Sequence, residues 1–397
     1  QIGGTFTKNG TLTHNYGKII FTSPQTLPAN VYYWLSLNGS GTYTLAGNTI
    51  VNSNLNIVSG VTVATAGYNL TAKRDVACNG TISGTGNLVL DNSTLNQTVS
   101  GSATLGNVKL NLGSSALAVR FYNSITITGK LDISGGFAVI YNNTTLTVGS
   151  TSTSTGDIKF NYSGAQIVSA NSATNTLLKV LGNSTAPQIT GAMITTNANV
   201  YMDRPLGMKL GGNTSIGGTL TVMNGALGLN GYDLNIGKTT STTGNYLPSG
   251  STSFLSNSST SAGYLRFLGS SGAAQITNAT LGSQYKVLIN RGNAQNKGIS
   301  MGNSFTVNNQ VIVQNGSIDL NGWVLTLGSS ASIYEATSFP IFGSTGYIQT
   351  TRSLGSALTN GNVAGLGLLL TTTGALGNTN IVRGHTVQSS GGNPSIK

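Results

Sequence analysis

Eight carboxylates are the residues best suited to acid–base chemistry in this chain. They are spread over 397 residues, and no two lie within fifteen positions of each other. The eight residues are Asp75, Asp91, Asp132, Asp157, Asp203, Asp233, Asp319 and Glu335. Hydrolysis of a polysaccharide needs carboxylates held in a close pair. No segment offers such a pair, so we predict no catalytic residues and no enzyme. A polysaccharide-degrading β-helix enzyme is the least favoured alternative.

Metal-binding residues are equally sparse. His14 and His385 are the two histidines and Cys78 is the one cysteine, which is too few for a zinc site. Glycine pairs such as Gly211-Gly212 lack the Lys-Ser/Thr of a phosphate loop. We therefore predict no metal and no cofactor. A single cysteine cannot form an internal disulfide, and we expect Cys78 to be a small buried residue.

Aromatic residues are the remaining candidates for a binding site. Tyr32, Tyr33 and Trp34 are consecutive, whereas Tyr232 and Trp323 fall at matching positions of an internal repeat. Aromatic rings can stack on sugars or can pack between subunits. We predict these five as candidate glycan or intersubunit contacts. For Tyr232 and Trp323 a structural ladder along the repeats is the favoured interpretation.

Composition points to an ordered β-protein with a polar, weakly basic surface. Only 7% of residues are charged, Gly accounts for 55, and apolar residues alternate with Ser, Thr and Asn. The formal charge of +11 arises because acids are scarce, and the 19 basic residues are scattered. We therefore expect no nucleic-acid partner. A modest attraction to polysaccharide or to the cell envelope remains an expectation.

Localisation follows from the start of the chain and its hydropathy. The chain begins with Gln1 rather than Met, which suggests a mature chain from which an export signal has been removed. No stretch approaches about 18 uninterrupted apolar residues, so we expect no membrane span. The expected location is extracellular or on the outer cell surface.

An imperfect repeat of 90 residues organises the chain. Segments 125–149, 216–237 and 305–328 each read as strand, Gly-containing turn, strand, short turn and strand. Segment 50–72 is a diverged fourth copy, and residues 239–262 form a Ser/Thr-rich, loop-like insertion. Short strands with regular Gly and Asn turns predict an all-β parallel β-solenoid. Tandem β-sandwich domains are the alternative.

Three regions are expected from this pattern. Residues 1–47 show no repeat and would be an N-terminal cap or an intersubunit arm. Residues 48–345 would form the solenoid of imperfect repeats, and residues 346–397 would form a C-terminal cap or tail.

The repeats and the tail resemble a known group of proteins. The motifs are ATLGNVKLNL from Ala103, LNGYDLNIG from Leu229 and LNGWVLTLG from Leu320, with GNTNIVRGHTVQ from Gly377 in the tail. Residues 48–397 resemble repeats of β-rich secreted surface proteins of Bacteroidota that the type IX system exports. The resemblance implies fibres, adhesins or envelope components. It implies no catalytic residues, and no sorting domain follows the tail-like segment in this sequence.

Two functions are consistent with these observations. The favoured one is a non-enzymatic extracellular structural protein, a subunit of a cell-surface filament, sheath or layer that assembles with itself. The alternative is a surface adhesin stalk that binds carbohydrate or a solid surface.

Overall fold

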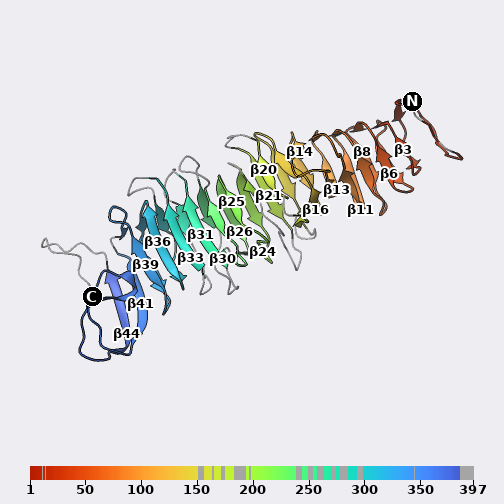
Figure 1. Cartoon of the computed structure of the whole chain (residues 1–397). Helices are drawn as coiled ribbons and strands as arrows, with labels where there is room; N and C mark the ends of the chain where they lie inside the picture. Colours follow the sequence, from red (N-terminus) through yellow and green to blue (C-terminus); the bar gives the residue numbers. More distant parts are fainter. Residues whose placement is uncertain are drawn as a thin grey trace. The chain divides into compact units, whose positions relative to one another are not determined.

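The chain forms a β-solenoid of about 12 turns, as the sequence predicts, with 54% of its residues in strands. Figure 1 shows the computed structural model. The structure describes all residues except 11, 14, 151–155, 163–164, 171–174, 183–193, 196–197, 238–243, 249–253, 257–262, 270–273, 277–284, 293–297, 344 and 385–397. The described residues contain no α-helix and one short 3₁₀ turn, η2 (Val363–Gly365).

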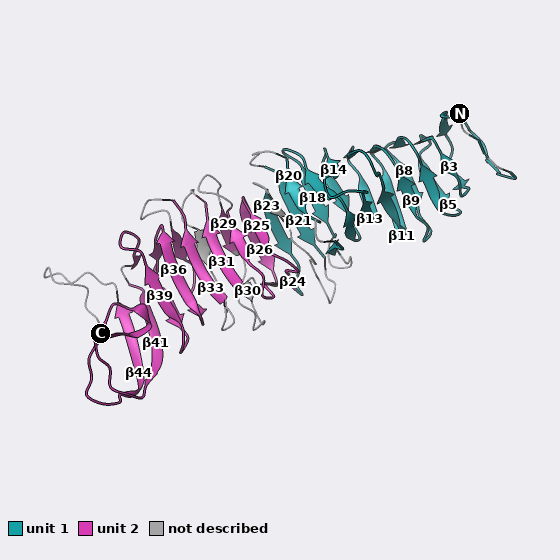
Figure 2. Cartoon of the chain, viewed as in Figure 1, with its two compact units in different colours: residues 1–206 teal, residues 207–397 magenta. Residues whose placement is uncertain are grey.

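The chain divides into two compact units, Gln1–Leu206 and Gly207–Lys397, which Figure 2 shows in different colours. The strands of the first unit are β1 (Lys18–Phe21), β2 (Thr26–Leu27), β3 (Val31–Tyr32), β4 (Trp34–Leu37), β5 (Gly41–Leu45), β6 (Thr49–Val51), β7 (Leu55–Ile57), β8 (Val61–Ala64), β9 (Leu70–Ala72), β10 (Val76–Cys78), β11 (Thr81–Leu90), β12 (Gln97–Ser100), β13 (Thr104–Asn111), β14 (Ala118–Phe121), β15 (Ile125–Ile127), β16 (Leu131–Gly135), β17 (Phe137–Ile140), β18 (Thr145–Val148), β19 (Ile158–Phe160), β20 (Ile167–Ser169), β21 (Leu177–Leu181), β22 (Ile194–Thr195) and β23 (Asn199–Asp203).

The second unit continues the strand numbering. Its strands are β24 (Met208–Lys209), β25 (Thr214–Ile216), β26 (Thr219–Asn224), β27 (Ala226–Gly228), β28 (Leu234–Ile236), β29 (Asn245–Pro248), β30 (Phe254–Ser256), β31 (Gly263–Leu268), β32 (Ala274–Ile276), β33 (Tyr285–Asn290), β34 (Ile299–Met301), β35 (Phe305–Val307), β36 (Gln310–Asn315), β37 (Ile318–Asp319), β38 (Val324–Leu327), β39 (Ser332–Glu335), β40 (Ile341–Phe342), β41 (Tyr347–Leu354), β42 (Gly361–Asn362), β43 (Leu369–Leu370) and β44 (Gly377–Gly384).

Strands of successive coils pair in parallel, so that apolar residues lie next to apolar residues of the neighbouring coil. In the first unit Leu35 pairs with Leu55, and Leu55 pairs with Val76. All three side chains are fully buried, so each coil adds one apolar side chain to an interior column. Burying a side chain of this size contributes about 1.5–3 kcal/mol. Sandwich domains are built from antiparallel sheets, so the parallel pairing excludes the tandem-sandwich alternative.

The period-two alternation in the sequence sets which side chains enter the core. In β26 Leu220 and Val222 are buried, while Thr219 and Thr221 are half-buried on the outer side. Successive side chains of a strand point to opposite faces. The Leu-Thr-Val pattern therefore fixes the inside and the outside of each coil without any charged residue.

The solenoid starts earlier than the sequence suggests. We expected residues 1–47 to be a cap or arm, but β1 pairs in parallel with β4, and β4 pairs in parallel with β7. Strand pairing thus reaches back to Lys18, and Ile2 also forms an isolated parallel bridge with Phe21. The reason is that Trp34–Leu37 supplies the buried residues Leu35 and Leu37 to the core, and parallel pairing does not require the repeat motif found later in the chain.

The C-terminal region differs from the coils. From β41 onward the pairing changes, because β41 joins β38 in parallel on one side and β44 antiparallel on the other. Strands β42 and β43 also form an antiparallel pair. Arg383 of β44 forms an ion pair with Glu335 of β39, which ties this region to the preceding coil. Residues 347–384 therefore close one edge of the second unit.

Candidate functional site

The eight carboxylates serve mainly as contacts between or within coils. Four of them form ion pairs, in the pairs Lys73–Asp91, Arg204–Asp157, Arg266–Asp233 and Arg383–Glu335. Three others accept hydrogen bonds: Asp75 from the Thr98 amide, Asp132 from Ser134 and Asn161, and Asp319 from the Asn321 amide. Within the described residues, no group of three His, Cys, Asp or Glu side chains gathers as a metal site would require. His14 and His385 lie outside those residues.

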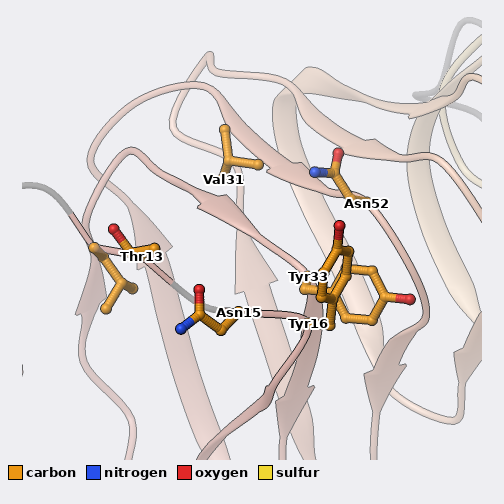
Figure 3. A pocket seen from close by; sticks show the side chains of 7 residues that line it. Thr13, Asn15, Tyr16, Val31, Tyr33 and Asn52 are labelled. Atoms are coloured by element: carbon orange, nitrogen blue, oxygen red, sulfur yellow. The ribbon is translucent and has the colours of Figure 1, made fainter.

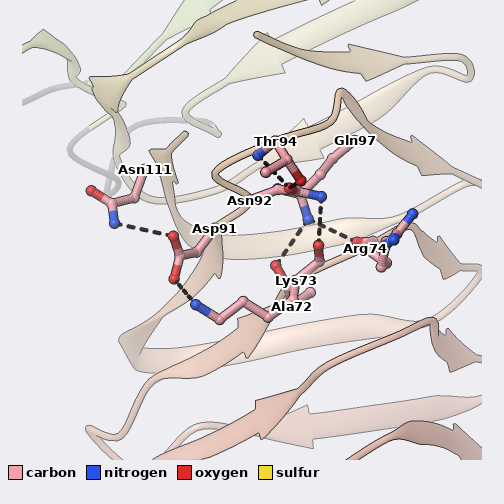
Figure 4. A network of polar contacts seen from close by, with 8 residues as sticks. All are labelled: Ala72, Lys73, Arg74, Asp91, Asn92, Thr94, Gln97 and Asn111. Carbon is pink, nitrogen blue, oxygen red and sulfur yellow. Dashed lines mark hydrogen bonds and ion pairs between the residues drawn. The ribbon is translucent and has the colours of Figure 1, made fainter. Parts of the chain in front are cut away.

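Figure 4 shows how polar side chains join neighbouring coils in the first unit. Gln97 is fully buried, and its amide donates to the carbonyls of Ala72 at 2.9 Å and Arg74 at 2.8 Å. Asn92 donates to the Lys73 carbonyl at 2.8 Å. A buried carbonyl without a partner costs about 1–3 kcal/mol, so these amides stabilise the corners where strands end.

A buried arginine also donates to backbone carbonyls where strands end. We name this place corner A and define it by Gly149, Gly156, Asp157, Leu181 and Arg204. Arg204 is 1% exposed, and its Nη1 donates to the carbonyls of Gly156 at 2.8 Å and Leu181 at 3.0 Å. Its Nη2 donates to Asp157 Oδ1 at 3.3 Å. Burial lowers the pKa of Arg204, and the Asp157 carboxylate opposes that shift.

The second unit contains an equivalent corner B, formed by Gly237, Gly244, Asn245, Leu268 and Arg291. Arg291 is fully buried, and its Nη1 donates to the Gly244 carbonyl and to the Leu268 carbonyl at 3.2 Å. Burial lowers its pKa to about 10. In both corners the first two glycines have positive φ, and a Cβ on Gly156 or Gly244 would lie 2.0 or 2.4 Å from the carbonyl oxygen of the coil above. Only glycine fits there.

The consecutive aromatic residues take three different places. Tyr32 is fully buried in the core, and burial raises its pKa to about 12. Trp34 is half-buried, and Lys18, its register partner in the preceding coil, lies 4.6 Å from its ring. These two residues stabilise the coil. Tyr33 lines a surface pocket.

Tyr232 and Trp323 occupy the tips of equivalent turns but do not form one ladder. Each follows an Asn-Gly pair with positive φ, and the two residues are 36% and 39% exposed. The strands after them, β28 and β38, belong to different sheets. The 90-residue repeat is therefore not a whole number of coils, and equal sequence positions lie at different edges. Tyr68, at the tip of the diverged copy, is 41% exposed and belongs with them. The signal for it was Ala-Gly-Tyr at the position of Asn-Gly-Tyr.

The asparagines of those turns bond to the backbone and not to one another in the contacts described. The Asn230 amide donates to the Leu210 carbonyl at 3.2 Å, and the Asn321 amide donates to the Met301 carbonyl at 3.1 Å. Each side chain thus reaches the backbone of the preceding coil.

A concave site formed by described residues lies beside Tyr33. Its cavity volume is about 590 Å³. Its lining residues are Leu12, Thr13, Asn15, Tyr16, Val31, Tyr33 and Asn52. The Tyr16 and Tyr33 rings meet edge to face, with centroids 5.0 Å apart and an interplanar angle of 90°. Figure 3 shows these two rings and Asn52 on one side of the pocket and Thr13 and Asn15 on the other. This arrangement can bind a small neutral ligand by ring contact and hydrogen bonds.

Sequence reasoning identified Tyr33 but missed the other pocket residues. Residues 12–16 lie before the first coil, whereas Val31 and Asn52 lie on or after strands of the next coils. No spacing in the sequence links them, because their proximity depends on how the segment before β1 folds back along the coils.

Comparison with known proteins gives no relative: no protein-family model, curated protein or solved structure matches the chain. Among the residues that the structure describes, no helix is of the length and hydropathy that would let it cross a bilayer.

Proposed function

We propose that this chain is a non-enzymatic extracellular structural protein, a subunit of a surface filament, sheath or layer that assembles with copies of itself. The observation that carries the proposal is the sparsely charged outer face of the coils, where polar side chains hydrogen-bond from coil to coil. Asn235 donates to Ser215 at 2.9 Å, and Asn56 donates at 2.9 Å to Ser36, which the neighbouring residues cover; each bond runs from one coil to the preceding one. Such a face can approach another copy without the repulsion that like charges would cause.

The few charged side chains support the same proposal. Lys179 lies 5.1 Å from the ring of Tyr201, its register partner in the next coil. Lys286 lies 5.6 Å from the ring of Tyr264 in the preceding coil. Together with the four ion pairs, these contacts give charged side chains a partner within the same chain. A cation over an aromatic ring contributes about 0.5–1 kcal/mol at an exposed site.

The resemblance of residues 48–397 to secreted surface repeats of Bacteroidota is a second, weaker support. It concerns the same Asn-Gly turns and alternating Leu-Thr strands that build the coils. Export by the type IX system and an outer-surface location are part of the proposal.

Sedimentation velocity of the purified chain over a hundredfold range of concentration tests the proposal. Growth from single chains to large species with increasing concentration is the expected result. Because each copy carries a net charge of +11, salt screens the repulsion between copies, and we expect growth at high salt to equal or exceed growth at low salt. A single species at every concentration would contradict the structural role.

A second candidate is an adhesin that binds carbohydrate or a solid surface. The pocket with Tyr16 and Tyr33 favours it, because exposed aromatic rings are a common platform for sugars. Binding of the purified chain to immobilised glycans tests this candidate, and uniform absence of binding would count against it.

A further inference from the structure

The pocket lies against a strand edge that the coils leave open. Strand β3 pairs with β6, and the Asn30 and Tyr32 carbonyls accept bonds from the Ile50 and Asn52 amides at 3.0 and 2.8 Å. Along a strand, the backbone amide and carbonyl of successive residues point alternately toward one neighbouring strand and toward the other. The amide and carbonyl of Val31 therefore point away from β6, and Val31 itself lines the pocket. They offer a donor and an acceptor on the side of β3 opposite β6.

Tyr16 is held in an unusual conformation beside this edge. Its φ is 62°, and Asn15 before it has a φ of 37°. A bulky residue with positive φ is a genuine outlier, and such strain concentrates at functional sites. Its side chain is nevertheless 81% exposed, so core packing does not explain the conformation. The Tyr16 ring stands edge-on to the Tyr33 ring, at an interplanar angle of 90°.

The polar groups of the pocket are neutral. Asn15, Asn52 and Thr13 supply amides and a hydroxyl, and the described residues lining the cavity carry no charge. Amides can donate and accept at once, as sugar hydroxyls do. None of the described lining residues offers a cation to an anionic ligand, and Lys8 donates to the Ala29 carbonyl and to Asn30.

We propose that this pocket is a binding site for a neutral saccharide, with Tyr16 and Tyr33 contacting the faces of the sugar ring and Asn15, Asn52 and the Val31 backbone bonding its hydroxyls. The volume of about 590 Å³ lies within the range of about 300–1,000 Å³ typical of small-molecule sites. The inference deepens the adhesin candidate. It does not depend on whether the chain also polymerises, which sedimentation measures separately.

An array of immobilised oligosaccharides is the first test. The neutral probes are β-glucan, mannan, galactan, xylan and chitin oligosaccharides, and the comparison probes are oligouronates and an extended Gly/Ser/Thr peptide. Binding to at least one neutral class is expected, with less than a twofold change in affinity between 50 and 500 mM salt, because screening acts on charges. A salt-sensitive preference for uronates would instead reflect the +11 charge of the whole chain and would overturn the proposal.

Substitutions locate the site. Tyr33→Ala and Tyr16→Ala should each weaken binding about tenfold, because each removes one aromatic face. Asn52→Ala should weaken it about threefold. Tyr68→Ala and Tyr334→Ala are matched controls, since both remove exposed tyrosines outside the pocket and should leave affinity unchanged.

Fold integrity is checked by far-ultraviolet circular dichroism and thermal unfolding of each variant. Tyr16→Phe keeps the ring and should retain binding to within about threefold, so it separates ring contact from loss of the local turn. Equal affinity of the wild type and the Tyr16→Ala/Tyr33→Ala double variant, absence of binding to every neutral probe, or preferential capture of the peptide would each overturn the proposal.

Discussion

Corners A and B solve the same structural problem with different charges. In each, two glycines with positive φ bring the ends of a Ser/Thr-rich segment close to the backbone of a neighbouring coil, and a buried arginine donates to two carbonyls there. Corner A adds the Asp157 carboxylate, which accepts from Arg204. Corner B has Asn245 at that position, and its buried Oδ1 has no hydrogen-bond partner among the described residues.

The difference shows what the corner requires. Glycine at the close approach and a long side-chain donor are common to both, so the carbonyls need a partner in either case. The carboxylate is an addition that offsets the cost of burying the guanidinium, as the opposing effects on the pKa of Arg204 indicate. Both corners therefore require a hydrogen-bond donor for their buried carbonyls. Only corner A also places a carboxylate beside the arginine.

The largest expected effect comes from removing the two arginines. Arg204→Met should lower the free energy of unfolding by about 3–5 kcal/mol, because it leaves Asp157 without its cation as well as two carbonyls without a donor. Arg291→Met should cost about 2–3 kcal/mol, since Asn245 is neutral. Guanidinium titrations followed by circular dichroism measure both.

Arg74→Met is the control for that comparison. Arg74 is exposed, and its substitution should stay within about 0.5 kcal/mol of the wild type. An equal loss for all three variants would show that the corners have no special role. A larger loss for Arg291→Met than for Arg204→Met would contradict the assigned difference between the corners.

The buried thiol of Cys78 extends the comparison to the pH dependence of stability, because it is a buried titratable group without an ion pair. Cys78 is fully buried in an interior column, and burial raises the pKa of its thiol from 9 to about 11. Between these values the unfolded chain loses the proton and the folded chain keeps it, so stability falls as pH rises. The loss at pH 11 should be about 2 kcal/mol.

Cys78→Ala identifies the origin of that loss. Its midpoint of thermal unfolding should fall less steeply than that of the wild type from pH 8.5 to 10, because the two proteins share the same tyrosines and differ only in the thiol. Thermal unfolding at half-unit intervals of pH measures this. Parallel curves for the wild type and Cys78→Ala would contradict the assignment to the thiol.

The smallest expected effect comes from exchanging the charges of the corners. Asp157→Asn should destabilise corner A by about 1 kcal/mol, whereas Asn245→Asp should stabilise corner B by a similar amount, because each changes one partly buried ion pair with an arginine. Paired denaturant titrations of the two variants measure the difference. Changes of the same sign in both would show that the corners are not equivalent.

The alternation of apolar and polar residues was enough to predict the solenoid. Leu325 and Leu327 enter the core on either side of an outward threonine, as the pattern requires. Two features were not visible in it. The first coils, at Lys18–Phe21 and Trp34–Leu37, lack the repeat motif, and residues 239–262 contain the strands β29 and β30 where we expected only a loop. Short strands inside Ser/Thr-rich sequence gain their stability from the neighbouring coil and have little local signal.

The sites were harder to predict than the fold. Arg204 and Gly156 are 48 residues apart, and the arginine reads as one of many scattered basic residues until the coils bring it to a carbonyl. The pocket has the same character, because Tyr16, Val31 and Asn52 come from three separate segments. Their roles depend on coil length, and the lengths of the turns vary too much in this sequence to fix it.

Electron cryomicroscopy of the purified chain at high concentration tests the central claim most directly. The account predicts multi-copy assemblies in which each subunit is a stack of parallel coils spaced by about 4.8 Å, with neutral Ser, Thr and Asn faces in contact between copies. Single chains at every concentration, or subunits joined through clusters of charged residues, would contradict it.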